Sequence, residues 1–304
     1  MYSYTSLDSM IDLENFEIPV CALTGRTNYE DYPWGALHLN LAQPIRVAKC
    51  KETGMLYLCP RPSKKNRETM LKGILPDALR EYGERTYNYA AVDKLRTFDF
   101  EERVLIFNTF FPKNNKIILD VGTSSGSFME IAIRHGWQAK GLEPFPDDVK
   151  VCQNKGLDVT LGLAESLPYA DNTFDVVHTS HVFEHLEDPL LAAREAYRVL
   201  KPGGLLFIEV PNQLDNFGFH RDMFFRNVQQ RKRDIASIHH LWFFGKKTLH
   251  QLYQRAGFTN IRVVNKHHKT FSGWRLPFSL LSKALSNLFY GTYIIRGFGY
   301  KPKG

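Results

Sequence analysis

The chain has 304 residues, a mass of 35.1 kDa and a formal charge of +7, from 39 basic and 32 acidic side chains. Hydrophobic residues make up 43% and charged residues 23%, which excludes a wholly disordered chain. No apolar run reaches the roughly 18–20 residues of a membrane-spanning helix, and residues 1–15 lack the pattern of a secretory signal. Four cysteines do not make a disulfide scaffold, so we expect a reducing, cytoplasmic location.

The charge is unevenly distributed along the chain. Residues 213–304 carry 16 basic and three acidic side chains, a charge of +13, which leaves −6 for residues 1–212. A basic last third favours an anionic partner for that part of the chain, although solubility alone explains the charge equally well.

The first hundred residues show no clear periodicity. They contain two short segments with Cys and Gly, at 21–25 and 50–54, and then a polar, helical stretch at 63–84. From about residue 98 the pattern changes, because residues 100–110 have the apolar spacing of a helix, which ends at Pro112.

Short apolar segments then alternate with helical ones. We predict strands at 116–121, 138–142, 157–161, 174–180, 205–210, 260–264 and 292–296, and helices at 127–135, 147–154, 188–200 and 249–258. Such alternation indicates a parallel sheet with right-handed crossovers and helices on both faces, which is a doubly wound α/β fold. Ligands of this fold bind beyond the carboxyl ends of the strands.

The strand at 116–121 leads into a glycine loop. The sequence LDVGTSSGSF places Gly122 and Gly126 between this strand and the next helix. Glycine lets the backbone turn tightly and approach a ligand closely. The loop lacks both the dinucleotide fingerprint and the Lys of a phosphate loop, so a carboxylate or adenosine ligand fits it better than a phosphate does.

Glu143 ends the second strand, 21 residues after Gly122. At this distance a doubly wound fold places the acid that accepts hydrogen bonds from the ribose hydroxyls. Glu143 alone would indicate only a solvated side chain, but with the glycine loop it indicates a nucleoside-like ligand.

These segments resemble the class I S-adenosylmethionine-dependent methyltransferases. The resemblance extends over residues 116–212, through ILDVGTSSGSF, GLEP, GLAESLPYADNTFDVVHTSHVFEHLEDP and REAYRVLKPGGLLFIEVPN, and continues at HLWFF (240–244) and LHQLYQRAGF (249–258). It implies a Rossmann-like sheet of seven strands, S-adenosylmethionine as the cofactor and methyl transfer as the reaction.

The resemblance also implies the cofactor-binding residues of this chain. They are Asp120, Gly122 and Gly126 around the methionine part, Glu143 at the ribose, Ala164 and Glu165 at the adenine, and in addition Thr123, Ser124 and His181. Two positions depart from the family pattern. Ser124 replaces a glycine, and Leu163 replaces an Asp beside adenine, with the loss of one hydrogen bond, about 1 kcal/mol. We expect binding to be weakened rather than abolished.

Residues 181–185 (HVFEH) match the H-x-x-E-H pattern of some zinc peptidases. That pattern requires a long helix, whereas here a strand precedes it and a new helix follows at Asp188, so we predict no metal there. In the methyltransferases that the chain resembles, this loop lies beside the sulfonium. His185 is therefore the candidate general base, and Glu184 the residue that orients it. A buried hydrogen-bonded pair that only closes the loop fits equally well.

The segments CALTG (21–25) and CKETG (50–54) each resemble half of a zinc ribbon, C-x-x-C-G, with Thr in place of the second Cys. Two thiolates do not make a tetrahedral zinc site, and the spacing of Cys59 fits neither half. We predict a ribbon-like module without metal. A ribbon before a methyltransferase sheet resembles the subgroup that includes deoxysugar C-methyltransferases and proteins of polysaccharide pathways, which implies carbohydrate biosynthesis.

We therefore predict three parts. They are the ribbon-like module with a helical linker at 1–97, the methyltransferase domain at 98–265, and a basic C-terminal helix with a last strand at 266–304. An Arg-containing insertion at 213–239 would cap the acceptor site. Because Arg pairs bind diphosphates, we expect an anionic acceptor such as a nucleotide-sugar or glycan precursor. Residues 277–290 carry a leucine stripe that suits either packing on the sheet or contact with an anionic membrane surface.

Two alternative functions stay open. RNA methylation fits the basic last third, but the chain has no basic stripe with stacking aromatics, so nucleic acid is not the expected partner. A non-catalytic partner protein that keeps the methyltransferase fold fits the degenerate ribbon, Ser124 and Leu163. The sequence leaves open the identity of the acceptor, the atom that is methylated and the oligomeric state.

Overall fold

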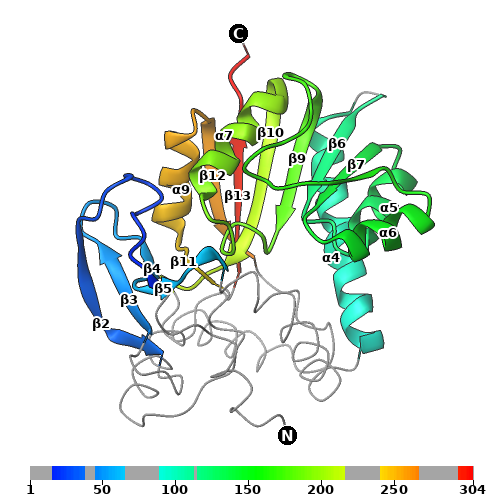
Figure 1. The fold of residues 1–304 in the computed structure, drawn as a ribbon. Coiled ribbons are helices and arrows are strands. Elements are labelled where there is room, and N and C mark those ends of the chain that lie inside the picture. Colours follow the sequence, from blue (N-terminus) through cyan, green and yellow to red (C-terminus); the bar gives the residue numbers. More distant parts are fainter. Residues whose placement is uncertain are drawn as a thin grey trace, which may run out of the picture. The chain divides into compact units, whose positions relative to one another are not determined.

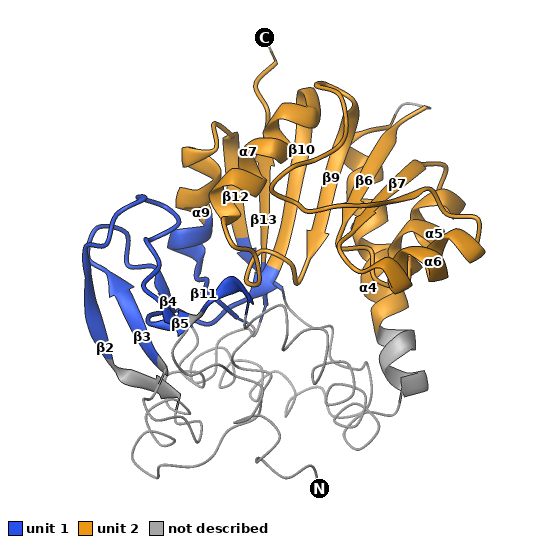
Figure 2. Cartoon of the chain, viewed as in Figure 1, with its two compact units in different colours: residues 1–82, 210–249, 264–295 blue, residues 83–209, 250–263, 296–304 orange. Residues whose placement is uncertain are grey.

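The structure is a computed structural model that describes residues 16–37, 45–65, 89–112, 115–215, 240–266 and 294–303. The chain divides into two compact units (Figure 2). One contains residues 1–82, 210–249 and 264–295, and the other contains residues 83–209, 250–263 and 296–304. Each unit is therefore built from segments that are distant in the sequence.

The second unit is built mainly on a seven-stranded sheet (Figure 1). In spatial order its strands are β12 (Thr259–Asn265), β13 (Ile294–Tyr300), β10 (Leu200–Pro211), β9 (Phe174–Ser180), β6 (Ile117–Val121), β7 (Gln138–Glu143) and β8 (Val159–Leu161). The four pairings from β10 to β8 are all parallel. The predicted α/β fold, with a mostly parallel, Rossmann-like sheet of seven strands, is confirmed.

The helices follow the strands in the predicted order. In the described residues they are α4 (Tyr89–Phe110), α5 (Ser127–Arg134), α6 (Pro146–Asn154), α7 (Pro189–Val199) and α9 (Lys246–Arg255). Helix α5 packs against β7, and α6 packs against β8. The side chain of Asp188 caps α7 by accepting hydrogen bonds from the backbone N–H groups of Leu190 and Leu191. The Asp-Pro pair therefore begins a helix, as predicted.

Several elements differ in extent from the prediction, and the largest differences are in α4, α9, β10 and β13. Helix α4 begins at Tyr89 rather than at residue 100. The prediction missed its first half because charged residues interrupt the apolar spacing there. The later half buries Val104 and Phe107 and carries the amphipathic signal. Strand β13 continues to Tyr300, beyond the predicted end at residue 296. The prediction ended the strand too early because Gly297 and Gly299 interrupt its apolar pattern.

The first unit contains a four-stranded sheet. In spatial order its strands are β11 (Trp242–Phe243), β4 (Leu56–Leu58), β3 (Ile45–Cys50) and β2 (Tyr29–Leu37), all paired antiparallel. A smaller pair joins β1 (Phe16–Glu17) to β5 (Arg61–Pro62). The rings of Tyr57 and Trp242, both buried, lie 5.5 Å apart. The HLWFF segment thus contributes a strand to the sheet formed by the N-terminal part of the chain.

The two Cys-containing turns of this unit repeat one hydrogen-bond pattern. The N–H of Gly25 donates to the carbonyl of Cys21 at 2.8 Å, and the N–H of Gly54 donates to the carbonyl of Cys50 at 2.9 Å. In both turns the Cys N–H donates at 2.9 Å to the carbonyl of the residue that follows the glycine. The two segments that resemble each other in sequence therefore also fold alike.

Three predictions concern residues outside those described. They are the part of the 63–84 helix beyond residue 65, the part of the 213–239 insertion beyond residue 215, and the leucine stripe at 277–290. Within the described parts of the chain, no helix combines the length and the apolar character needed to cross a bilayer.

Candidate active site

The loop between β6 and α5 turns as its glycines predict. Gly122 and Gly126 have φ angles of +77° and +78°, a region that costs a residue with a side chain about 1–2 kcal/mol. A Cβ atom at Gly122 would lie only 2.5 Å from Cγ2 of Val182. Gly122 therefore has neither the conformation nor the space for a side chain, and its backbone stays accessible for close approach.

Ser124 lies in the same left-handed region, with φ +49°. Its backbone N–H donates to Oε2 of Glu143 at 2.8 Å, and its carbonyl accepts from the thiol of Cys152 at 3.1 Å. These contacts hold the turn from both sides. The loop therefore tolerates a serine where the family pattern has glycine, at the expense of local backbone strain.

Glu143 ends β7 with only 3% of its surface exposed. Besides the N–H of Ser124, its carboxylate accepts the N–H of Phe145 at 3.2 Å. Burial raises the pKa of the Glu143 carboxyl, and the two backbone donors oppose this change. A carboxylate has about four acceptor positions, so Glu143 retains capacity for two neighbouring ligand hydroxyls.

Apolar side chains near Glu143 are exposed. The exposed fractions are 39% for Phe145, 53% for Leu161 and 54% for Leu163. Leu161 pairs directly with Glu143 across the β7–β8 ladder. Exposed apolar groups beside a buried carboxylate suit a flat, partly apolar ligand. Sequence reasoning missed Phe145, whose only signal was an aromatic residue two positions after the acid.

Ala164 and Glu165 follow in the turn after β8. Ala164 is buried, and Oε1 of Glu165 accepts the backbone N–H groups of Glu187 at 3.1 Å and of Asp188 at 3.4 Å. Glu165 therefore connects this turn to the loop before α7. The contact of both residues with adenine stays a prediction, and so does the part of the buried Thr123, in the glycine loop, in binding the cofactor.

Residues 181–185 form a turn and not a helix. The N–H of His185 closes this turn on the carbonyl of Val182 at 2.9 Å. A zinc-peptidase motif needs both histidines on one face of a helix. That geometry is not present in this loop, and the absence of a metal there stays a prediction.

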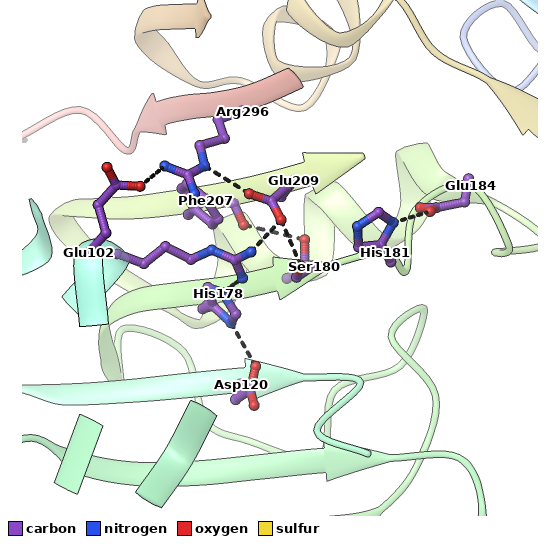
Figure 3. Close-up of polar contacts among 11 residues, drawn as sticks. Glu102, Asp120, His178, Ser180, His181, Glu184, Phe207, Glu209 and Arg296 are labelled. Carbon is purple, nitrogen blue, oxygen red and sulfur yellow. Dashed lines mark hydrogen bonds and ion pairs between the residues drawn. The ribbon is translucent and has the colours of Figure 1, made fainter. Parts of the chain in front are cut away.

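Glu184 lies between two histidines. Its carboxylate is fully buried, and Oε1 lies 3.2 Å from Nδ1 of His181 (Figure 3) and 3.8 Å from Nε2 of His185. The side chains of His181 and His185 are 48% and 39% exposed. Sequence reasoning paired Glu184 with His185 alone, whereas the structure places it closer to His181. Both imidazoles are accessible, and the carboxylate between them is not.

His181 has two further features of a functional residue. It has φ +57°, the left-handed region, directly after β9. Burial acts to lower the pKa of His181, but the carboxylate of Glu184 outweighs burial and holds the pKa above its usual value of 6.5. Backbone strain and a shifted pKa at the end of a strand are typical of functional sites.

Asp120 lies next to the glycine loop, near the end of β6, with 3% of its surface exposed. It pairs in register with His178 of β9, and Oδ1 of Asp120 lies 2.7 Å from Nδ1 of His178. Sequence reasoning treated the strand FDVVHTS as a buried run and assigned no role to its histidine. A histidine within an otherwise apolar strand was the only available signal.

The described residues fit the parts of S-adenosylmethionine. The glycine loop leaves room for close backbone contact, Glu143 is a buried acceptor for hydroxyls, and Phe145 and Leu163 offer apolar surface. A sequence profile described as "Methyltransferase domain" matches residues 84–263, more than half of the chain. The chain belongs to the methyltransferase domain family.

Two curated relatives and one solved structure agree with this family. The methyltransferase is 35% identical over 107 residues to an uncharacterized methyltransferase of Mycobacterium sp. (strain JLS), over 34% of this chain and 42% of the relative. It is 35% identical over 135 residues to a ubiquinone/menaquinone biosynthesis C-methyltransferase of Ruegeria sp. (strain TM1040), over 40% and 54%. The chain thus spans about half of the length of the curated relatives it matches.

The solved structure is a SAM-dependent methyltransferase from Thermotoga maritima. It aligns with 74% of this chain and 98% of its own, with a TM-score of 0.50 and 20% identity. This likeness concerns the fold alone, and it agrees with the α/β, Rossmann-like architecture of the seven-stranded sheet.

Proposed function

We propose that this methyltransferase transfers a methyl group from S-adenosylmethionine to an anionic small-molecule or saccharide acceptor, such as a nucleotide-sugar or glycan precursor. The hydrogen bond between the N–H of Ser124 and the carboxylate of Glu143 carries the cofactor assignment, because it joins the glycine loop to the ribose acceptor. The family match over residues 84–263 supports the same assignment.

Each part of the site has a separate task in this proposal. The backbone around Gly122 meets the methionine part, Glu143 accepts the ribose hydroxyls, and the apolar side chains of Phe145 and Leu163 cover the adenine. S-adenosylmethionine supplies an activated methyl group on a sulfonium. Because methyl transfer is an in-line displacement, the protein contributes mainly by positioning the two reactants and excluding water.

A hydroxyl or acidic carbon acceptor must also lose a proton. We assign His185 as the base and Glu184 as the residue that orients it, with His181 as the second candidate because its contact with Glu184 is shorter. A neutral imidazole takes the proton, and the buried carboxylate stabilises the resulting imidazolium. Comparing His185→Ala with His181→Ala, with cofactor affinity and turnover measured separately, identifies the base. The base is the histidine whose replacement abolishes turnover but leaves the affinity for the cofactor unchanged.

The charge of the chain supports an anionic acceptor. Residues 213–304 carry +13, while residues 1–212, which contain the proposed cofactor residues, carry −6. A basic segment attracts diphosphate or carboxylate groups. The predicted capping role of residues 213–239 and the cytoplasmic location are part of this proposal, and for residues 277–290 both packing on the sheet and contact with an anionic membrane surface stay open.

We further propose that the N-terminal part is a ribbon-like module that has lost its metal. The two turns repeat the same backbone hydrogen bonds, and Sγ of Cys21 lies 3.7 Å from the hydroxyl of Thr53 in the other turn. The hydroxyls of Thr24 and Thr53 accept the backbone N–H of the second residue after them, at 3.3 and 3.2 Å. In these turns the threonine hydroxyls therefore accept the backbone hydrogen bonds that zinc-bound thiolates would accept in a metal-containing ribbon.

Calorimetry and methyl transfer test the proposed function. We expect S-adenosylmethionine to bind and a radiolabelled methyl group to appear on a nucleotide-sugar or other anionic glycan precursor. Label on RNA, with an affinity that falls steeply with log[salt], would favour the RNA alternative. A folded protein that does not bind S-adenosylmethionine would contradict the proposal and favour the non-catalytic alternative.

A further inference from the structure

A buried polar chain runs behind the glycine loop (Figure 3). It begins at Asp120, continues through His178 and Arg103 to Glu209, and ends at Arg296 and Glu102. Every member except Glu102 has a side chain that is at most 7% exposed. Burying so many charges has a large desolvation cost, so the arrangement calls for an explanation beyond the closure of a core.

Within this polar chain, His178 connects the ion pairs of Arg103 to Asp120, which lies next to the glycine loop. Its Nε2 lies 3.1 Å from Nη1 of Arg103, and its Nδ1 lies 2.7 Å from Oδ1 of Asp120. A guanidinium only donates hydrogen bonds, so Nε2 must accept and the proton of a neutral imidazole must be on Nδ1. His178 therefore donates to Asp120, and Arg103 selects the tautomer that makes this possible.

The imidazole of His178 cannot easily turn. Its ring is stacked between Phe128 at 3.7 Å and Phe207 at 5.4 Å, with interplanar angles of 11° and 6°. Burial, together with the nearby charge of Arg103, lowers the pKa of His178, which agrees with a neutral ring. The stacking fixes the plane of the ring, and the two hydrogen bonds fix its orientation within that plane.

Arg103 is held in turn by Glu209. Nη2 of Arg103 donates to Oε1 of Glu209, and Nε of Arg296 donates to Oε2 at 2.7 Å. The hydroxyl of Ser180 also donates to Oε1, at 3.2 Å. Because both oxygens of Glu209 are engaged by cations, Arg103 has a fixed place from which to meet His178.

We propose that Arg103 and His178 are positioning residues that hold the carboxylate of Asp120 in place for the α-ammonium group of the bound cofactor. This inference rests on the proposed function, since it assumes that S-adenosylmethionine binds at the glycine loop. One oxygen of Asp120 receives the Nδ1–H of His178, and the other has acceptor capacity for a cationic ligand. The chain between Glu209 and Asp120 then fixes the direction in which that oxygen faces.

Two ligands separate this role from a merely structural one. S-adenosylhomocysteine carries the α-ammonium group, whereas 5′-methylthioadenosine has the same adenosine and sulfur but no amino-acid part. The affinity for S-adenosylhomocysteine divided by the affinity for 5′-methylthioadenosine, here called the affinity ratio, reports the contribution of the amino-acid part alone. A general loosening of the protein lowers both affinities and leaves the ratio unchanged.

Two substitutions of His178 provide a matched pair. The amide of His178→Asn lies where Nδ1 was and can still donate to Asp120, while the amide of His178→Gln lies where Nε2 was and cannot reach it. We expect His178→Gln to lower the affinity ratio about tenfold, the size of one charge-assisted hydrogen bond. His178→Asn should change it by no more than about twofold.

Glu102→Gln is the control. Glu102 pairs with Arg296 at 2.8 Å and does not contact His178 or Asp120. This variant should lower the melting temperature and leave the affinity ratio at the wild-type value. If His178→Gln keeps the wild-type ratio, or if Glu102→Gln lowers the ratio as much, the positioning role is wrong.

A measurement on the unmodified protein covers the case in which the His178 variants fail to fold. Nitrogen-15 NMR of the histidine side chains should show His178 protonated at Nδ1, and protonation at Nε2 would overturn the inference. If the wild-type protein binds neither ligand, the proposed function itself fails. If it binds both and only the ratio in His178→Gln is unaltered, this inference fails alone.

Discussion

The backbone N–H of Ser124 donates a 2.8 Å hydrogen bond to Oε2 of Glu143. Ser124 follows strand β6 and Glu143 ends the neighbouring parallel strand β7, and the register of the two strands places Val121 beside Leu142. The shape of the glycine loop and the orientation of the carboxylate therefore depend on each other. A change in either residue should affect both the stability of the loop and the affinity for the cofactor.

Replacing Glu143 with Gln tests the ribose assignment. The carboxylate accepts two backbone N–H groups, from Ser124 and Phe145. A Gln side chain has only one acceptor oxygen, so its NH₂ group would face a donor. An unsatisfied buried donor costs about 1–3 kcal/mol, and we expect affinity for S-adenosylhomocysteine to fall by about tenfold or more.

Calorimetry measures this affinity, and thermal unfolding shows whether the variant is folded. Asp147→Asn serves as the control, because the side chain of Asp147 is 96% exposed. It should bind like the wild type. Equal affinity in Glu143→Gln and the wild type would show that Glu143 does not hold the ribose.

Replacing Ser124 with Gly should stabilise the protein. The φ angle of +49° costs a serine about 1–2 kcal/mol, and the greater chain entropy of glycine offsets about 0.5–1 kcal/mol of the gain. We expect the free energy of unfolding, measured by urea denaturation, to rise by about 0.5–1 kcal/mol. Ser125 has no positive φ, so Ser125→Gly relieves no strain and should lower the free energy of unfolding. A similar loss in both variants would mean that Ser124 is not strained.

Local sequence patterns predicted the elements that carry the cofactor site. Strand β6, helix α5 and strand β7 follow each other directly, so apolar spacing and two glycines suffice to place Gly122 and Glu143 at adjacent strand ends. The capping of α7 by Asp188 was readable for the same reason. In each case the interacting residues are close in the sequence, or the topology of the fold brings them together.

Contacts between distant segments could not be read from the sequence. Arg103 and His178 are 75 positions apart, and their pairing depends on how α4 lies on the sheet. Glu184 lies closer to His181 than to His185, and this difference depends on the path of the loop, which includes a positive φ at His181 that the sequence analysis did not predict. The side chains that surround a site are thus harder to predict than the loops that form it.

The contact between His181 and Glu184 should make stability depend on pH. The folded-state pKa of His181 is raised, so this ion pair contributes stability that is fully present below the unfolded pKa, about 6.5. The contribution is lost as the pH rises through the folded-state pKa. The difference in free energy of unfolding between the wild type and Glu184→Gln should therefore decrease as the pH rises above about 6.5 and through the folded-state pKa of His181.

Urea denaturation at a series of pH values measures this difference. The control is the same Glu184→Gln change made in a His181→Gln background. There the difference should no longer vary with pH, since the titrating partner is missing. If the variation persists, another group, such as His185 at 3.8 Å, is responsible.

The turns at residues 21–25 and 50–54 allow a test of the ribbon-like module by restoring a metal site. Sγ of Cys21 lies 3.7 Å from the hydroxyl of Thr53, and Cys21 and Cys50 are both buried. Burial raises the pKa of the Cys21 thiol. In the proposed ribbon-like module, Cys21, Thr24, Cys50 and Thr53 would take the places of the four zinc ligands, and two of these positions carry hydroxyls.

The double variant Thr24→Cys, Thr53→Cys should bind one zinc ion per chain and gain thermal stability from it. Four thiolates in two C-x-x-C-G turns satisfy tetrahedral zinc, and metal binding to such a site adds directly to folding free energy. Metal analysis of protein purified without chelator, and melting with and without chelator, measure both effects. Thr24→Ser, Thr53→Ser keeps the hydroxyls and should behave like the wild type. If the double cysteine variant stays free of zinc at saturating metal, the two turns do not converge on one tetrahedral centre and the ribbon-like interpretation is wrong.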